Sequence, residues 1–108
     1  MPSAYKVLGQ SNPAATTDTT LYTVPASTST VVSTISVANL GTSGTFRIAI
    51  RPAGAAIANQ HYIAFDVAVN ANDSMMFTLG ITLAATDVIT VQASNTSFAF
   101  SAYGTEIT

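Results

Sequence analysis

The stretch TFRIAIRP, residues 45–52, decides the fold class because apolar and polar side chains alternate along it. In an extended chain Phe46 and Ile48 fall on one face, and Arg47 and Arg51 fall on the other. A period of two is typical of a β-strand that buries one face and exposes the other. We therefore expect this stretch to be a strand at the surface of a β-sheet.

The same period recurs along the rest of the chain, and a helical period is hard to find. Seven further stretches, rich in β-branched and aromatic residues, are predicted strands: YKVLG, LYTVP, STVVSTISVANL, HYIAFDVAV, MMFTLG, DVITVQAS and SFAFSAYGTEI. Turn signals such as SNP, PAGAA, NAND and AATD separate them. Many short strands at close spacing indicate an all-β fold, a single antiparallel β-sandwich of about eight strands that is either immunoglobulin-like or jelly-roll-like.

The length of 108 residues fits one domain. Residues 1–30 are rich in Thr, Ser, Ala and Pro and carry only isolated apolar side chains. We expect them to form an extended N-terminal segment with short strands, and residues 31–108 to form the core of the sandwich.

The alternation also predicts a register for two successive hairpins, one closed by the loop at residues 39–44 and one closed by the loop after Pro52. In this register the following residues face each other: Val37 and Ile48, Ile35 and Ile50, Ile48 and Phe65, Ile50 and Ile63, Arg47 and Asp66, Arg51 and Tyr62. All the apolar pairs then point inward, as a half-buried sheet requires, and Ala64 points outward.

The outward pairs give the two arginines a structural interpretation. Arg47 is then the partner of Asp66 in an exposed ion pair, which contributes little to stability. Arg51 lies over the ring of Tyr62, a contact with some cation–π character. The functional alternative is that the arginines bind an acidic partner or a sugar at a subunit boundary, where the planar guanidinium holds a carboxylate in a fixed geometry.

The sequence offers no arrangement of residues typical of catalysis or metal binding. The one histidine, His61, lies five residues before Asp66 on one predicted strand, so their side chains point to opposite faces. The chain has no cysteine and no nucleophile elbow. The cluster Asn70–Asp73 is interpreted as a turn, because one carboxylate is too few for calcium. We expect no enzymatic activity, no metal and no cofactor.

The composition bears on the partners. Charged residues make up 7% of the chain, against roughly 25% in ordinary soluble domains. Three basic residues and a net charge of −2 do not suit nucleic acid, and no apolar run reaches the ~18 residues of a membrane span. The first residues, MPSAYKVLGQSNP, lack the basic-then-apolar order of a secretory signal. A surface this poor in charge suits a subunit that its neighbours largely cover.

Several motifs carry a resemblance that extends over nearly the whole chain: LGQSNPA, LYTVP, RPAGAAIANQHYIAFD and LAATDVITV, followed by the closing YGTEI. In these stretches the chain resembles small virion structural proteins of tailed bacteriophages, especially phages of cyanobacteria and marine bacteria. The resemblance implies a β-sandwich that assembles on the phage particle and has no enzymatic activity. None of the motifs separates a place in the head from a place in the tail.

We expect a capsid decoration, or cement, protein of the virion, assembled in the host cytoplasm. Its partners are then the major capsid protein and further copies of itself, with a trimer favoured. The alternative is a tail or fibre module that binds host carbohydrate, for which Tyr62 and Tyr103 offer aromatic surface. The candidate interface residues are Tyr5, Val7, Leu8, Tyr22, Arg47, Arg51, Tyr62 and Asp66.

Overall fold

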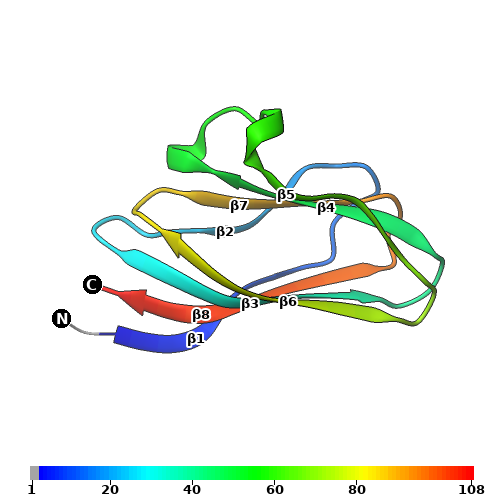
Figure 1. The fold of residues 1–108 in the computed structure, drawn as a ribbon, viewed down its shortest axis with the longest axis horizontal. Helices are drawn as coiled ribbons and strands as arrows, with labels where there is room; N and C mark the ends of the chain where they lie inside the picture. The colour runs from blue at the N-terminus through cyan, green and yellow to red at the C-terminus, as the bar shows by residue number, and fades with distance from the viewer. Residues whose placement is uncertain (1–2) are drawn as a thin grey trace.

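The structure is a computed structural model that describes residues 3–108, and it consists almost entirely of β-strands (Figure 1). The elements are β1 (Ser3–Ser11), β2 (Thr19–Thr23), β3 (Ser29–Asn39), β4 (Gly44–Arg51), the short helices η1 (Pro52–Gly54) and η2 (Asn59–His61), β5 (Tyr62–Val69), β6 (Ser74–Leu83), β7 (Val88–Ala93) and β8 (Phe98–Ile107). The strands form two four-stranded antiparallel sheets that lie one above the other, as the edge-on view of Figure 1 shows. The predicted β-sandwich is confirmed.

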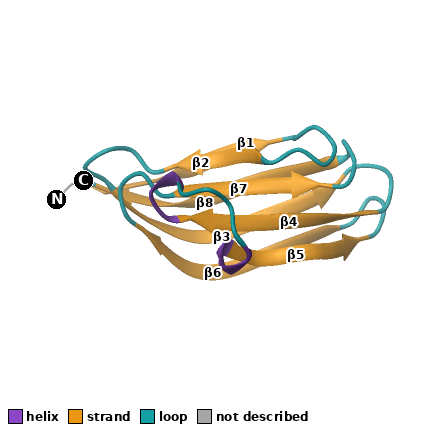
Figure 2. Cartoon of the chain, turned by 90° about the horizontal axis from the view of Figure 1, so that it is seen from above, coloured by secondary structure: helices purple, strands orange, loops and turns teal. Residues whose placement is uncertain are grey.

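The strand order decides between the two predicted topologies. One sheet has the order β1-β8-β3-β6 and the other has the order β2-β7-β4-β5 (Figure 2). Pairs therefore form between β1 and β8, β2 and β7, β3 and β6, and β4 and β5. A long two-stranded ribbon that folds over on itself gives this order, which is the jelly-roll winding. Each connection except the one between β4 and β5 crosses from one sheet to the other.

The core lies between the sheets and is built around a cluster of aromatic rings. The ring of Phe46 on β4 lies 5.9 Å from Phe77 and 6.0 Å from Phe100 in edge-to-face geometry. Phe98 completes the cluster at 6.3 Å from Phe46. Such ring pairs contribute beyond the apolar area that they bury. Because these rings come from both sheets, they join the two layers.

The N-terminal segment contributes an edge strand to each sheet, since β1 pairs with β8 and β2 pairs with β7. Leu21, Tyr22 and Val24 are buried and belong to the core cluster. The core therefore draws on residues before 31 as well as on the later strands.

The predicted hairpin between residues 29–40 and 44–51 is wrong. β3 pairs with β6 and β8, whereas β4 pairs with β5 and β7, so the loop between them carries the chain from one sheet to the other. The buried side chain of Asn39 holds this corner by donating hydrogen bonds to the carbonyl oxygens of Thr42 (2.8 Å) and Val69 (3.1 Å). β3 and β4 bury the same alternate residues whether they are neighbours in one sheet or face each other from two sheets across the core. Their alternation therefore fits either arrangement.

The second predicted hairpin, β4 with β5, is confirmed, but its register holds only at one end. Phe46 lies opposite Val67 as the alternation requires, and beyond this point a β-bulge shifts the pairing so that Ile48 lies opposite Ala64. The backbone of Asp66 is left-handed at the bulge, with a φ of 51°. An extra residue reverses the alternation of a strand. The predicted inward positions of Phe65 and Ile63 are therefore wrong.

The shift in register at the bulge determines which side chains of β5 are exposed. Ala64 is 8% exposed and belongs to the core, whereas Phe65 is 52% exposed and Ile63 is 46% exposed. Two large apolar side chains thus lie at the surface of the edge strand β5, where the sequence pattern placed them inside.

Candidate functional surfaces

Arg47 and Asp66 form the ion pair that the sequence predicts, on the outer face of β4 and β5. The guanidinium donates from Nε to Oδ1 of Asp66 at 2.7 Å and from Nη2 to Oδ2 at 3.3 Å. This two-point geometry is the one for which arginine is suited. The hydrogen bond from Arg47 holds the pKa of the Asp66 carboxyl below its usual value, so the pair stays charged at neutral pH.

Phe65 extends this pair into an aromatic surface. The guanidinium carbon of Arg47 lies 4.0 Å from the centre of the Phe65 ring. The ring of Tyr62 meets Phe65 edge to face, with centroids 4.8 Å apart and an interplanar angle of 86°. The sequence interpretation missed Phe65 because the bulge that exposes it has no local signature apart from an aspartate, a residue type that tolerates left-handed backbone.

The predicted contact between Arg51 and Tyr62 is wrong. Arg51 instead donates hydrogen bonds to the carbonyl oxygens of Ala55 (2.7 Å) and Gly54 (3.0 Å) and to the hydroxyl of Thr90 (3.3 Å). These contacts fasten the loop after β4 to the outer face of the sheet, so Arg51 has a structural role.

A shallow groove of about 220 Å³ lies beside the ion pair. Its lining is mostly polar and comes from Thr16, Thr45, Phe46, Arg47, Asp66, Gln92 and Ser94. The amide of Gln92 donates a 2.9 Å hydrogen bond to Asp18, which orients it along the rim. Hydroxyl, amide, guanidinium and carboxylate groups next to an aromatic ring can bind a hydroxyl-rich ligand.

The four N-terminal candidates separate into exposed and buried residues. Tyr5 is 86% exposed and Val7 is 48% exposed, and both lie on the outer face of the sheet that β1 borders. Leu8 is half-buried against the core, at the point where the register of β1 shifts. Tyr22 is only 7% exposed, because β2 turns it between the sheets. The prediction that Tyr22 lies at an interface is therefore wrong.

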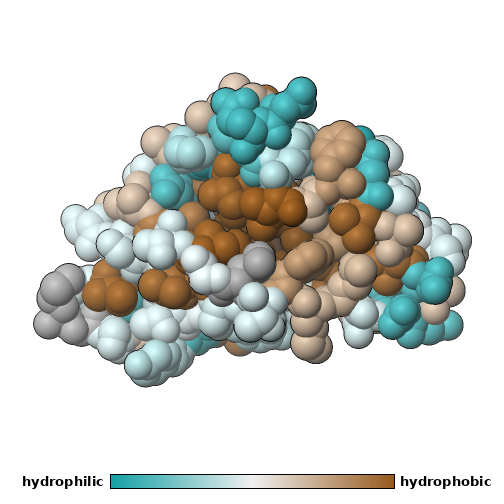
Figure 3. Space-filling view, in the orientation of Figure 1, coloured by the Kyte–Doolittle hydropathy of each residue, from teal (hydrophilic) through white to brown (hydrophobic). Residues whose placement is uncertain are grey.

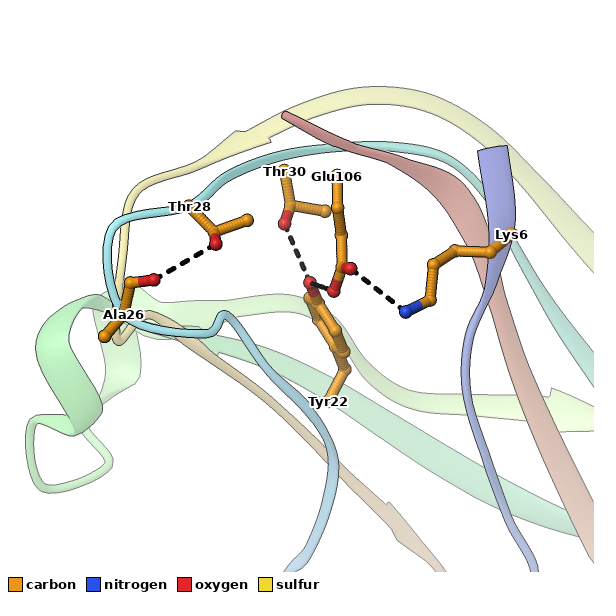
Figure 4. A network of polar contacts seen from close by, with 6 residues as sticks. All are labelled: Lys6, Tyr22, Ala26, Thr28, Thr30 and Glu106. Atoms are coloured by element: carbon orange, nitrogen blue, oxygen red, sulfur yellow. Dashed lines mark hydrogen bonds and ion pairs between the residues drawn. The ribbon is translucent and has the colours of Figure 1, made fainter. Parts of the chain in front are cut away.

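Tyr22 instead forms a polar network that joins the two sheets (Figure 4). Its hydroxyl donates to Oε2 of Glu106 at 2.6 Å, and the hydroxyl of Thr30 lies 2.8 Å from the Tyr22 hydroxyl. Glu106 also accepts a 3.0 Å hydrogen bond from Lys6. Burial, followed by the bond to Glu106, raises the pKa of Tyr22 to about 12, and the bonds from Tyr22 and Lys6 lower the pKa of Glu106.

The outer face of the sheet β1-β8-β3-β6 is free of unpaired charge. Its strands contain two charged residues, Lys6 and Glu106, and these bind each other. Tyr5 and Val31 both lie beside Thr105, and Val7 lies beside Tyr103. The face therefore presents apolar side chains among hydroxyls.

Tyr62 and Tyr103 do not form one aromatic surface, because Tyr62 is on β5 and Tyr103 is on β8 of the other sheet. Each tyrosine therefore offers its own aromatic surface, and the ring that lies beside Tyr62 is that of Phe65.

His61 lies in η2, where its Nδ1 accepts a 3.1 Å hydrogen bond from the backbone N–H of Ala58. Within residues 3–108, three or more His, Asp or Glu side chains do not gather at any point as metal ligands would. None of the helices in this part of the chain is long and apolar enough to cross a membrane.

The comparisons with known proteins found no similarity. No protein-family model matches the chain, and neither a curated protein nor a solved structure matches it.

Proposed function

We propose that the protein is a non-enzymatic structural component of the virion of a tailed bacteriophage, a decoration or cement protein that binds the major capsid protein as a homo-oligomer. The observation that carries the proposal is the uncharged outer face of the sheet β1-β8-β3-β6, where Tyr5 and Val7 are exposed among Ser and Thr residues. The resemblance of the sequence to phage virion proteins supports it. The jelly-roll winding, which recurs among viral capsid and lectin domains, is compatible with it.

Copy number in the purified particle tests this proposal. A decoration protein covers the shell, so its amount should be comparable to that of the major capsid protein, as measured by quantitative mass spectrometry of sedimented virions. A few copies per particle would contradict a place on the head.

A double variant tests the proposed surface. Tyr5→Lys with Val7→Lys adds charge to the outer face of an edge strand, and we expect at least tenfold weaker binding to heads that lack the protein. Leu40→Lys is the matched control, because Leu40 is 68% exposed but lies in the loop after β3. Equal binding of both variants would contradict this surface as the contact.

A second candidate function, a tail module that binds host carbohydrate, is favoured by the aromatic and polar surface around Arg47. Phe65 and Tyr62 present ring surface there, and the groove beside Asp66 and Gln92 presents hydrogen-bonding groups. Sugars are bound by this combination of ring faces and planar polar side chains.

Binding to an array of bacterial surface glycans tests this candidate. Phe65→Ala should abolish a specific signal, and Tyr103→Ala on the opposite sheet should leave it unchanged. If no glycan binds Tyr103→Ala more strongly than Phe65→Ala, the carbohydrate role is contradicted.

A further inference from the structure

The two open sides of the sandwich differ. At one side β1 packs against β2, and the network of Tyr22, Glu106 and Lys6 closes the gap between the sheets (Figure 4). At the other side the edge strands are β5 and β6, which do not pack closely against each other. Figure 3 shows this side, and apolar side chains gather in a stripe between the layers. Four large apolar side chains of these two edge strands are exposed: Ile63, Phe65, Met75 and Met76.

The four edge strands also differ in their protection against pairing with another chain. Charges, prolines, bulges and short length are the usual devices that block an edge. β1 carries Lys6, β2 is short and is followed by Pro25, and β5 is bulged at the charged Asp66. On β6, residues 74–78 carry no charge, proline or bulge, and they pair regularly with β3. Residues 74–78 of β6 are therefore an edge stretch without such a device, and the irregularity of β6 comes only after Thr78.

The hydrogen-bond pattern shows which residues of β6 offer their backbone to a neighbour. The N–H of Asn39 on β3 donates to the carbonyl of Asp73 at 2.8 Å, and these two residues lie opposite each other. In an antiparallel pair, every second residue directs its N–H and C=O to the partner strand. Counted from Asp73, Met76 therefore directs its N–H and C=O away from β3, and so does Thr78.

We infer that β6 pairs antiparallel with β6 of a second copy of this chain, about a two-fold axis at Met76. In this register Met76 lies opposite Met76 of the other copy, Met75 lies opposite Phe77, and Ser74 lies opposite Thr78. Apolar residues thus face apolar residues, and hydroxyls face hydroxyls. The sheet continues across the axis, and the apolar stripes of the two copies meet.

Charge favours a second copy as the occupant. Along the chain, the charged residue nearest to the axis is Asp73, which directly precedes β6 and lies three residues from Met76. Two copies therefore hold their Asp73 carboxylates six residues apart along the strand pair, or ~20 Å. This exceeds the Debye length of ~10 Å at ordinary ionic strength, so repulsion between the copies is screened. A two-fold contact of one surface with itself is the commonest form of assembly. The inference concerns the free protein and does not depend on the particle proposed above.

Single cysteines test the register, because the chain has no cysteine of its own. Directly opposite residues of a hydrogen-bonded antiparallel pair have Cα atoms ~5.5 Å apart, within the range that a disulfide spans. Met76→Cys should therefore form a covalent dimer under mild oxidation. Thr78→Cys is the matched control: its two copies would lie ~14 Å apart, so it should cross-link at least tenfold more slowly. Equal rates, or no cross-linking of either variant, would overturn the inference.

Sedimentation equilibrium of the purified protein tests the dimer without a cross-link. The wild-type protein should dimerise, and Met76→Lys, which places two like charges on the axis, should weaken the dimer at least tenfold. Tyr5→Lys adds the same charge to the other edge of the same sheet and should leave the dimer unchanged. A wild-type protein that stays monomeric at ~100 μM, or equal weakening by both variants, would overturn the inference. A monomer that still binds particles would leave the proposed function intact.

Discussion

The hydroxyl of Tyr22 on β2 donates a 2.6 Å hydrogen bond to the carboxylate of Glu106 on β8, and this contact joins the two sheets at one side of the sandwich. Glu106 is largely withdrawn from water, since its side chain is 14% exposed, and Lys6 binds its other oxygen at 3.0 Å. Burial of a carboxylate is tolerated where several donors satisfy it. The network therefore fastens the N-terminal strands to the rest of the fold.

Removal of the Tyr22 hydroxyl should lower the free energy of unfolding. Tyr22→Phe leaves the Thr30 hydroxyl and the Oε2 atom of Glu106 without this partner in a place that water reaches poorly, so we expect a loss of about 1–3 kcal/mol. Tyr5→Phe removes the same hydroxyl from a side chain that is 86% exposed and should change stability very little. Urea denaturation of the two variants measures the difference. Equal losses would contradict the stabilising role of the network.

The stability of the protein should fall in acid through Glu106. Its pKa in the folded state lies below the ordinary value of 4.5, because Tyr22 and Lys6 donate hydrogen bonds to the carboxylate. As pH falls, the unfolded chain therefore takes up a proton before the folded chain does, and unfolding is favoured. The contribution is present above pH ~4.5 and is lost as pH falls through the folded-state value.

Urea denaturation between neutral pH and pH ~3, for the wild type and for Glu106→Gln, tests this dependence. The wild type should have the higher free energy of unfolding at neutral pH, and its difference from Glu106→Gln should become smaller as the pH falls. An advantage that stays constant with pH would show that the charge of Glu106 does not contribute.

Two phenylalanines on neighbouring strands test the register of β4 and β5. Phe46 is 1% exposed and contacts three other rings, so Phe46→Ala should cost about 3–5 kcal/mol. Phe65 is 52% exposed, so Phe65→Ala should cost less than about 1 kcal/mol. Chemical denaturation measures both values. Similar losses of stability for the two substitutions would support the register without a bulge, in which Phe65 points into the core.

Alternation alone predicts the interior of β4 and the contact of Arg47 with Asp66, because the bulge leaves the Asp66 side chain on the outer face beside Arg47. It fails at Phe65 and Ile63, since one inserted residue at the bulge reverses the side chains that precede it in β5, and a bulge is set by tertiary packing rather than by a run of residue types. Asp66 has the left-handed backbone that marks the bulge, yet the same residue type is common in ordinary turns.

Alternation also does not tell a hairpin from a sheet crossing. The pattern that buries Ile35 and Val37 on β3 and Phe46 and Ile48 on β4 is satisfied with the strands in one sheet or in two. The short loop after Asn39 permits either path. The aromatic surface at Phe65 and the apolar edge at β6 follow from these two features, so the sequence pattern alone did not predict them.

Two glycines offer a matched test of close packing between strands. A Cβ on Gly104 of β8 would collide with the backbone carbonyl of Val31 on β3, where neither strand can move away cheaply. Gly104→Ala should therefore cost at least about 2 kcal/mol. A Cβ on Gly80 meets no atom within 4 Å, so Gly80→Ala should change stability by less than about 1 kcal/mol. Thermal and urea denaturation of both variants measure this contrast, and equal effects would contradict the close approach of β8 and β3.

The proposed attachment to phage particles should resist salt and yield to mild denaturant. The chain has three basic and five acidic residues, and among the described ones Arg47 is bound to Asp66 and Lys6 to Glu106, which leaves few charges for a partner. At 1 M salt the Debye length is ~3 Å, so a contact that depends on charge would be lost, whereas apolar contact is barely affected. Low urea weakens apolar burial and should release the protein first.

Sedimentation of purified virions in low salt, in ~1 M salt and in low urea measures how much protein remains on the particle, with the major capsid protein as the control for intact shells. We expect retention in both salt conditions and release in urea while the shells still sediment. Release by salt alone would place the contact on charged groups such as Arg47 and Asp66. The uncharged face of the sheet β1-β8-β3-β6 would then not be the surface that meets the shell.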